Sequence, residues 1–210
     1  FINGMSQGPP GTNPVFSTAG LANGDNITVI GTQLGCSTTS NNLNFTVFGY
    51  PVVSLFNNGE LEICTGENTD LTAVGADNYQ FQINAVPFGP FSPVNTFTAP
   101  LNNGDVVTVL GETNGCASTA QSSFTFTVNT FPVTNSNATP GTTICLGDTV
   151  TIVSSGASDY QFDFNGSVQQ FGTSSTFETD QLENGDALTV IGFNGDCPSV
   201  PETFTFNVNT

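Results

Sequence analysis

The sequence contains no lysine, arginine or histidine, and it contains no tryptophan. Its 17 aspartates and glutamates give the 210 residues a formal net charge of −17 at pH 7. Side chains in such a chain cannot form salt bridges with one another, so we expect the fold to depend on apolar burial, backbone hydrogen bonds and disulfides. Basic residues supply most of the affinity for nucleic acid and for anionic lipid. The composition therefore excludes both as partners.

The missing residue types also restrict catalysis. Without histidine or lysine, no Ser-His-Asp or Cys-His arrangement can form. Two facing carboxylates could still hydrolyse glycosides, but the most regular acids, Asp25, Asp105 and Asp186, recur once per repeat beside an Asn-Gly turn. A residue copied in every repeat is far more often a turn former than a catalyst. We interpret these aspartates as structural, with carboxylates that accept nearby backbone N–H groups, and we predict that the protein is not an enzyme.

Long apolar runs are missing as well, and no stretch approaches the 18 residues of a membrane-spanning helix. The chain is nevertheless expected to fold, because 37% of its residues are hydrophobic and 19 are phenylalanine. That is enough to fill small cores despite the net charge.

Acidic loops at module ends raise the question of calcium. Glu67 and Asp148, with Asp77 and Asp159, could supply oxygen ligands there. The Asp-x-Asp-x-Asp-Gly spacing of an EF-hand is absent, however, and the acidic clusters are sparse. We expect no cofactor, and calcium is the alternative that stays open.

Internal repeats organise the chain. Leu21-Ala-Asn-Gly-Asp25 recurs as Leu101-Asn-Asn-Gly-Asp105 and as Leu182-Glu-Asn-Gly-Asp186, and a cysteine follows each aspartate by eleven residues: Cys36, Cys116 and Cys197. A second series, Cys64 and Cys145, precedes two Tyr-Gln-Phe triplets by fifteen residues. The register predicts the C-terminal part of one repeat at 1–49 and complete repeats at 50–130 and 131–210.

Within each repeat, apolar residues alternate with polar ones. Phe124, Phe126 and Val128 alternate with threonines, and Asn-Gly and Gly-Asp steps separate the alternating runs. About seven short strands in some eighty residues are typical of an immunoglobulin-like sandwich. The predicted fold class is all-β, with tandem immunoglobulin-like β-sandwich repeats of about 80 residues.

The order of these motifs resembles a known group of repeats. Cys-x-Gly-(Glu/Asp), a β-run such as Val150-Thr-Ile-Val, Tyr-Gln-Phe, Asn-Gly-Asp, then a cysteine and a threonine-rich strand is similar to the immunoglobulin-like or PKD-like repeats of giant Bacteroidota cell-surface proteins. The resemblance implies secretion by the type IX system, as in gliding-motility adhesins and predatory surface hooks. The sequence departs from many such repeats at Phe81 and Phe162, where they carry tryptophan.

Five cysteines in a phased repeat predict disulfides in an oxidising compartment. The first cysteine of a module should lie near the A–B turn and the second in the F–G hairpin, at opposite ends of a sandwich and roughly 20 Å apart. A disulfide needs Cα atoms within about 7 Å. We therefore prefer a bridge between successive modules, Cys64–Cys197, with partners of Cys36, Cys116 and Cys145 outside this sequence. The pairs within modules, Cys64–Cys116 and Cys145–Cys197, are the alternative.

These features predict a structural or adhesive segment of a long extracellular surface fibre, stiffened by disulfides. Its expected partners are neighbouring repeats of the same chain and a homo-oligomeric bundle. Two alternatives stay open: a ligand- or carbohydrate-binding module, and an accessory domain of a secreted enzyme. The first would need a surface patch that differs between repeats, and the sequence shows none.

Overall fold

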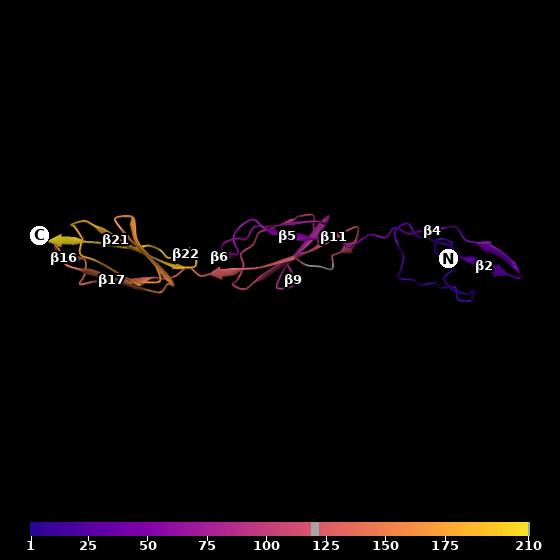
Figure 1. Cartoon of the computed structure of the whole chain (residues 1–210), viewed down its shortest axis with the longest axis horizontal. Helices are drawn as coiled ribbons and strands as arrows, with labels where there is room; N and C mark the ends of the chain where they lie inside the picture. Colours follow the sequence, from indigo (N-terminus) through magenta and orange to yellow (C-terminus); the bar gives the residue numbers. More distant parts are fainter. Residues whose placement is uncertain (119–121, 210) are drawn as a thin grey trace.

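The structure, a computed structural model, describes residues 1–118 and 122–209. Every regular element in this part of the chain is a β-strand, so no helix there could cross a membrane. The strands gather into three groups that follow one another in a row (Figure 1). The C-terminus lies at one end of the row, and the hairpin that contains β2 lies at the other.

The first complete sandwich has two facing sheets. One sheet consists of β5 (Ser54–Asn57), β7 (Leu71–Val74) and β10 (Thr96–Phe97). The other consists of β8 (Asn78–Ile83), β9 (Val86–Pro87), β11 (Val106–Thr113), β12 (Cys116–Ala117) and β13 (Ser122–Thr125). A separate parallel pair joins β6 (Glu62–Cys64) to β14 (Thr127–Asn129) at one end of the sandwich.

The second sandwich repeats this topology. Its first sheet consists of β15 (Asn135–Thr139), β17 (Val150–Ser155) and β20 (Thr176–Thr179). Its second sheet consists of β18 (Asp159–Phe164), β19 (Ser167–Gly172), β21 (Ala187–Asn194), β22 (Cys197–Pro198) and β23 (Glu202–Thr205). The parallel pair is β16 (Thr143–Cys145) with β24 (Asn207–Asn209).

Each sandwich has its own hydrophobic core. Of the alternating residues predicted from the sequence, Phe126 lies inside the first core, and Phe206 takes its place in the second. Val107 and Val109 are also fully buried in the first core. Phe81 and Phe162 are also buried. Full burial of an apolar side chain of this size contributes about 1.5–3 kcal/mol, so apolar packing can hold modules that contain no side-chain ion pairs.

The N-terminal group is less complete. It consists of β1 (Asn26–Ile27), β2 (Ile30–Gln33), β3 (Cys36–Thr39) and β4 (Leu43–Asn44). These strands correspond to the second half of a sandwich, and several of their apolar side chains are uncovered: Val29 is 59% exposed, whereas its counterpart Val109 is 0% exposed. The repeat limits predicted at 49/50 and 130/131 fall in the extended stretches between the three groups of strands.

Candidate functional site: the junction between modules

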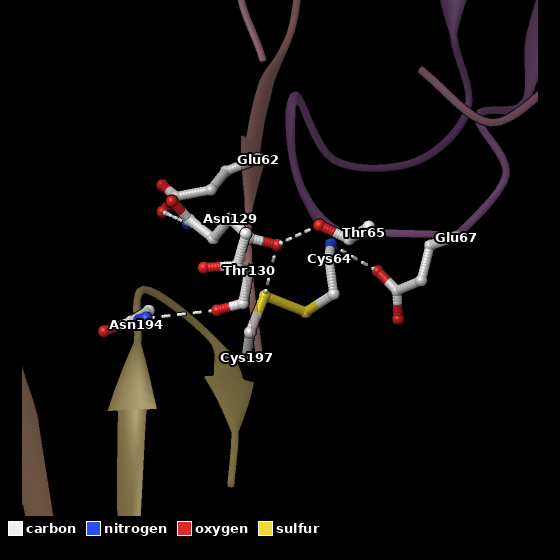
Figure 2. The surroundings of a disulfide bond; sticks show 8 residues. All are labelled: Glu62, Cys64, Thr65, Glu67, Asn129, Thr130, Asn194 and Cys197. Carbon is white, nitrogen blue, oxygen red and sulfur yellow. Dashed lines mark hydrogen bonds between the residues drawn. A yellow bond between two sulfur atoms is a disulfide. The ribbon is translucent and has the colours of Figure 1, made fainter. Parts of the chain in front are cut away.

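A disulfide joins the two complete sandwiches. It links Cys64, at the end of β6, to Cys197, at the start of β22, with a Cα–Cα distance of 5.6 Å (Figure 2). Both residues are buried. This is the pair preferred from the sequence, and because its two cysteines bond to each other, neither of the alternative pairs with Cys116 and Cys145 forms.

Backbone hydrogen bonds hold Cys64 at the end of its module. The parallel β6–β14 ladder places it opposite Asn129. Its N–H donates to Glu67 Oε2 at 2.8 Å. Next to it, the Thr65 N–H and hydroxyl donate to the Asn129 carbonyl oxygen at 2.8 and 3.0 Å. The turn that carries the sulfur is therefore fixed by the last strand of its own sandwich.

A tight hairpin presents Cys197 from the next module. The two-residue connection Gly195-Asp196 joins β21 to β22, with Asn194 opposite Cys197. Gly195 has a φ of +57°, and a Cβ at this position would meet Asn129 Nδ2 and Glu62 Oε1. The hairpin tip thus lies directly against the end of the preceding module, and glycine suits both this close contact and the positive φ.

Polar contacts add to the disulfide across the junction. The Asn194 side-chain amide donates to the Thr130 carbonyl oxygen at 3.1 Å, and Cys197 Sγ lies 3.8 Å from the Asn129 carbonyl oxygen (Figure 2). On the near side, Asn129 Nδ2 donates to Glu62 Oε1 at 2.6 Å. The Asn194–Thr130 hydrogen bond thus adds to the bridge across the junction, and the Asn129–Glu62 bond orders the surface that receives the hairpin.

The three other cysteines are free thiols in positions equivalent to the bonded ones. Cys145 ends β16 as Cys64 ends β6, and its N–H donates to Asp148 Oδ2 at 2.8 Å. Cys36 and Cys116 occupy the hairpin position of Cys197, in β2–β3 and β11–β12. Cys36 and Cys145 are exposed, and Cys116 is half-buried.

Four carboxylates lie close to the disulfide. Glu60, Glu62, Glu67 and Asp196 line a cavity of about 310 Å³ beside it. Within residues 1–118 and 122–209, no group of three or more His, Cys, Asp or Glu side chains is arranged to hold a metal ion. The acids considered for calcium also lie at opposite ends of the sandwich. Glu67 accepts the Cys64 N–H at the disulfide, whereas the Asp77 N–H donates to Thr113 Oγ1 beside the β11–β12 hairpin.

The repeated aspartates occupy a hydrogen-bonded turn. Asp105 is buried, and its Oδ2 accepts from the Asn102 N–H at 2.8 Å. Its Oδ1 accepts from Asn84 Nδ2 at 2.7 Å, and Asn84 Oδ1 accepts the Val106 N–H at 2.9 Å. Asp25 with Asn3, and Asp186 with Asn165, form the same arrangement. These contacts fit a structural role in each repeat.

Sequence reasoning missed the asparagine partners. Asn3, Asn84 and Asn165 all have positive φ, between 48° and 52°, which asparagine tolerates better than most residues. Each of these asparagines precedes its aspartate by 21 or 22 residues, and this repeated spacing could have identified the pairs from the sequence. Backbone hydrogen bonds lower the pKa of Asp25 and Asp105 below the ordinary value, from the N–H of Ala22 and Asn102 respectively, and the paired asparagine side chains lower it further.

One surface differs between the two sandwiches, although the sequence showed no such patch. In the first sandwich, β9 has only two residues, and a cavity of about 280 Å³ opens beside it, lined by Tyr79, Phe81 and the 59%-exposed Phe88. In the second sandwich, the six residues of β19 pair along β18 instead. Pro87 and Pro90 explain the difference, because proline cannot donate to a strand ladder.

Comparisons with known proteins establish the fold. No protein-family model matches the sequence, and no curated protein matches it. Among solved structures, it is similar to the fibronectin(III)-like modules of Clostridium thermocellum CbhA, with 12% identity over 74% of this chain and 94% of that chain and a TM-score of 0.52. A chain from the complex of mouse coronavirus receptor-binding domain with its murine receptor matches with 12% identity over 75% of this chain and 100% of that chain, at a TM-score of 0.51.

The chain consists of tandem immunoglobulin-like β-sandwiches. The fold class predicted from the sequence is therefore confirmed. Likeness at 12% identity shows the fold alone, so these structures assign no ligand or activity to the chain.

Proposed function

We propose that the chain is a segment of a long extracellular surface fibre or adhesin shaft, in which disulfides hold successive immunoglobulin-like modules in a fixed relative orientation. The observation that carries this proposal is the Cys64–Cys197 bridge, because it joins two modules rather than closing one. In this role the chain acts mechanically and catalyses no reaction.

The organisation of the junction supports this role. Only the stretch 130–134 separates the last strand of one sandwich from the first strand of the next. A short connection beside a disulfide gives two covalent links between the same two modules, so bending at the junction must strain both. A shaft that transmits force benefits from this stiffness, whereas a flexible linker would absorb the motion.

Composition supports a location outside the cell. Disulfides persist in oxidising compartments, and a chain without lysine or arginine offers no cleavage site to trypsin-like proteases. The motif order resembles Bacteroidota repeats exported by the type IX system, and we propose the cell surface as the site of action. Neighbouring repeats of the same chain are the main partners, and calcium is not required.

Nuclear magnetic resonance can test the stiffening directly. Residual dipolar couplings report whether two domains tumble as one body. With the bridge intact, both sandwiches should fit a single alignment tensor. In the double variant Cys64→Ser/Cys197→Ser, the tensors should separate in magnitude. The matched control, Cys116→Ser/Cys145→Ser, removes two free thiols and should leave the single tensor unchanged. One tensor for both double variants would contradict a stiffening role.

A ligand-binding function is the second candidate, and the cavity beside Phe88 favours it. Tyr79, Phe81 and Phe88 line this cavity, and in the second sandwich the longer β19 takes the place of β9. Titration with a panel of oligosaccharides should then shift resonances of Tyr79 and Phe81, and Phe88→Ala should abolish the shifts. Absence of shifts across the panel would remove carbohydrate as the ligand class.

A further inference from the structure

The Cys64–Cys197 disulfide closes a loop that contains most of both sandwiches. The two cysteines are 133 residues apart in the sequence. The chain between them, 65–196, is called the closed loop, and it includes the core strands β7, β8 and β11 of the first sandwich and β17, β18 and β21 of the second. Because the two sulfur atoms connect its ends, the closed loop is by far the longer of two covalent routes from Cys64 to Cys197.

We propose that this disulfide sets the path of mechanical force. Tension along the chain runs from the first strands of one module through Cys64–Cys197 into the last strands of the next, and the core strands inside the closed loop carry none of it. This inference rests on the proposed function, because the path matters only in a chain that is pulled. It adds a limit on extension, since the closed loop cannot be drawn out while the bridge is intact.

The segment 51–64 carries tension in the first sandwich. It starts at the end that faces the N-terminal group of strands, contains β5 and β6, and reaches the junction at Cys64 (Figure 1). β5 is an edge strand paired with β7, and β6 forms the parallel ladder with β14. Leu55 and Ile63 hold the segment against the core. A peripheral segment thus connects the two ends of the sandwich.

The segment 197–209 has the same role in the second sandwich. It starts at the junction with β22, contains β23 and β24, and ends at the far end of the sandwich (Figure 1). Phe206 and Val208 are buried in the core, and β24 pairs in parallel with β16. Most of the segment is strand, which rises about 3.3 Å per residue and is close to full extension. It therefore has little length to give under load.

Without the bridge, the same tension would pass through every strand in series. It would enter the first sandwich at β5, leave through β14, cross the stretch 130–134 and enter the second sandwich at β15. Both cores would then lie in the path, and the resistance of the chain would be set by the rate at which each sandwich unfolds under force. The bridge replaces that non-covalent resistance with a covalent bond.

Disulfides from Cys116 and Cys145 to other modules of a longer array are compatible with this path. They would bring tension into the stretch 116–145, which also runs the length of both sandwiches. That stretch is shorter than 65–115 and shorter than 146–196, which hold the core strands, so it becomes taut before they do. The core strands thus stay outside the path in the array as well.

Single-molecule stretching of the full chain, held by peptide handles at its two termini, tests the proposal. The oxidised protein should never release the closed loop, whose separation of 133 residues corresponds to roughly 450 Å of contour. Cys64→Ser/Cys197→Ser should lengthen the fully stretched chain by that amount, whereas the control Cys116→Ser/Cys145→Ser should not. Equal final lengths for the two double variants would overturn the proposal.

A core variant shows whether tension reaches the closed loop. A Cβ on Gly111, in β11, would meet Val53 and Ala76, so Gly111→Ala weakens the first sandwich. In the Cys64→Ser/Cys197→Ser background, it should speed unfolding at a fixed force by roughly tenfold. With the bridge intact, it should leave the extension at that force unchanged, and a response there would overturn the proposal. If that response appears while both sandwiches share one alignment tensor, this inference fails and the proposed function stands.

Discussion

At the scale of single residues, each repeat closes one turn with an asparagine–aspartate pair. Asn84 and Asp105 do not form an ion pair, but their side chains bond to each other and together accept hydrogen bonds from two backbone N–H groups. A chain without basic residues has no cation with which to pair a buried carboxylate. Amide donors take that place here, which explains how an aspartate can be copied into every repeat without destabilising it.

We predict that Asp105→Asn lowers the free energy of unfolding by about 1–3 kcal/mol, because an amide in this site must turn its NH₂ group toward either the Asn102 N–H or the Asn84 amide. Urea unfolding monitored by tyrosine fluorescence measures the change. Asp77→Asn makes the same change of charge at an exposed side chain and should alter stability by less than about 0.5 kcal/mol.

The lowered pKa of Asp105 and Asp25 predicts how this contribution varies with pH. A carboxylate whose folded pKa lies below its unfolded value, about 3.9, stabilises the fold fully above pH 4 and loses that effect as pH falls through the folded pKa. The stability difference between the wild type and Asp105→Asn should therefore shrink below pH 4. A difference that stays constant from pH 6 to pH 2 would show that ionisation of Asp105 contributes nothing.

Gly111 in β11 and Gly31 in β2 provide a matched pair for testing packing. A Cβ on Gly111 would meet Val53 Cγ2 and Ala76 Cβ, whereas no atom lies within 4 Å of such a Cβ on the equivalent Gly31. Gly111→Ala should destabilise the first sandwich by about 1–3 kcal/mol through overpacking. Gly31→Ala should leave its unfolding midpoint unchanged. Calorimetry of both variants checks this, and equal midpoints would contradict the close packing.

At the scale of elements, the β21–β22 hairpin, which corresponds to the F–G hairpin of an immunoglobulin-like sandwich, determines how the two modules contact each other. Its two-residue connection is short enough for the tip to reach the end of the preceding module, and the parallel β6–β14 pair places the partner cysteine at that same end. The sandwich thus carries a projecting half and a receiving half at opposite ends. Repetition of one module is sufficient to produce a junction at every step.

The hairpin tip yields a prediction on disulfide formation. Gly195→Ala would place a methyl group against Asn129 and Glu62 at a positive φ. After reduction, reoxidation of Cys64 with Cys197 should be slowed by about an order of magnitude, since the variant strains the hairpin tip at a positive φ and must displace the ends of the Asn129 and Glu62 side chains. Gly115→Ala, at a positive φ in the β11–β12 hairpin and facing open space, is the control and should leave that rate unaltered. Peptide mapping at timed quenches follows the reaction.

At the scale of the whole molecule, the net charge of −17 controls association between shafts. Lateral contact brings acidic modules side by side along their length, so repulsion opposes bundling. The Debye length falls from about 10 Å at 0.1 M salt to about 3 Å at 1 M. Light scattering of the Cys36→Ser/Cys145→Ser variant, in which these two exposed thiols cannot form disulfides between copies, should show lateral association only at the higher ionic strength. Equal scattering at both salt concentrations would contradict electrostatic control.

The sequence by itself determined the strand pattern, the repeat and the core. Alternation of Phe126 with threonine is a local signal, because side chains on a strand point alternately to the two faces. The positions of Cys64 and Cys197 in their repeats also predicted a bridge at the junction, because the two ends of one sandwich lie too far apart for a disulfide. These inferences need only the geometry of a strand and the length of a bond.

Only the tertiary structure decided which residues surround the bridge and the turns. Asn84 and Asp105 are distant in sequence, and their bond depends on the pairing of β8 with β11. Likewise, Gly195 against Asn129 is a contact between modules, and the cavity beside Phe88 depends on where β9 ends. Such contacts arise from how whole sheets and modules pack, which no local pattern of residues encodes.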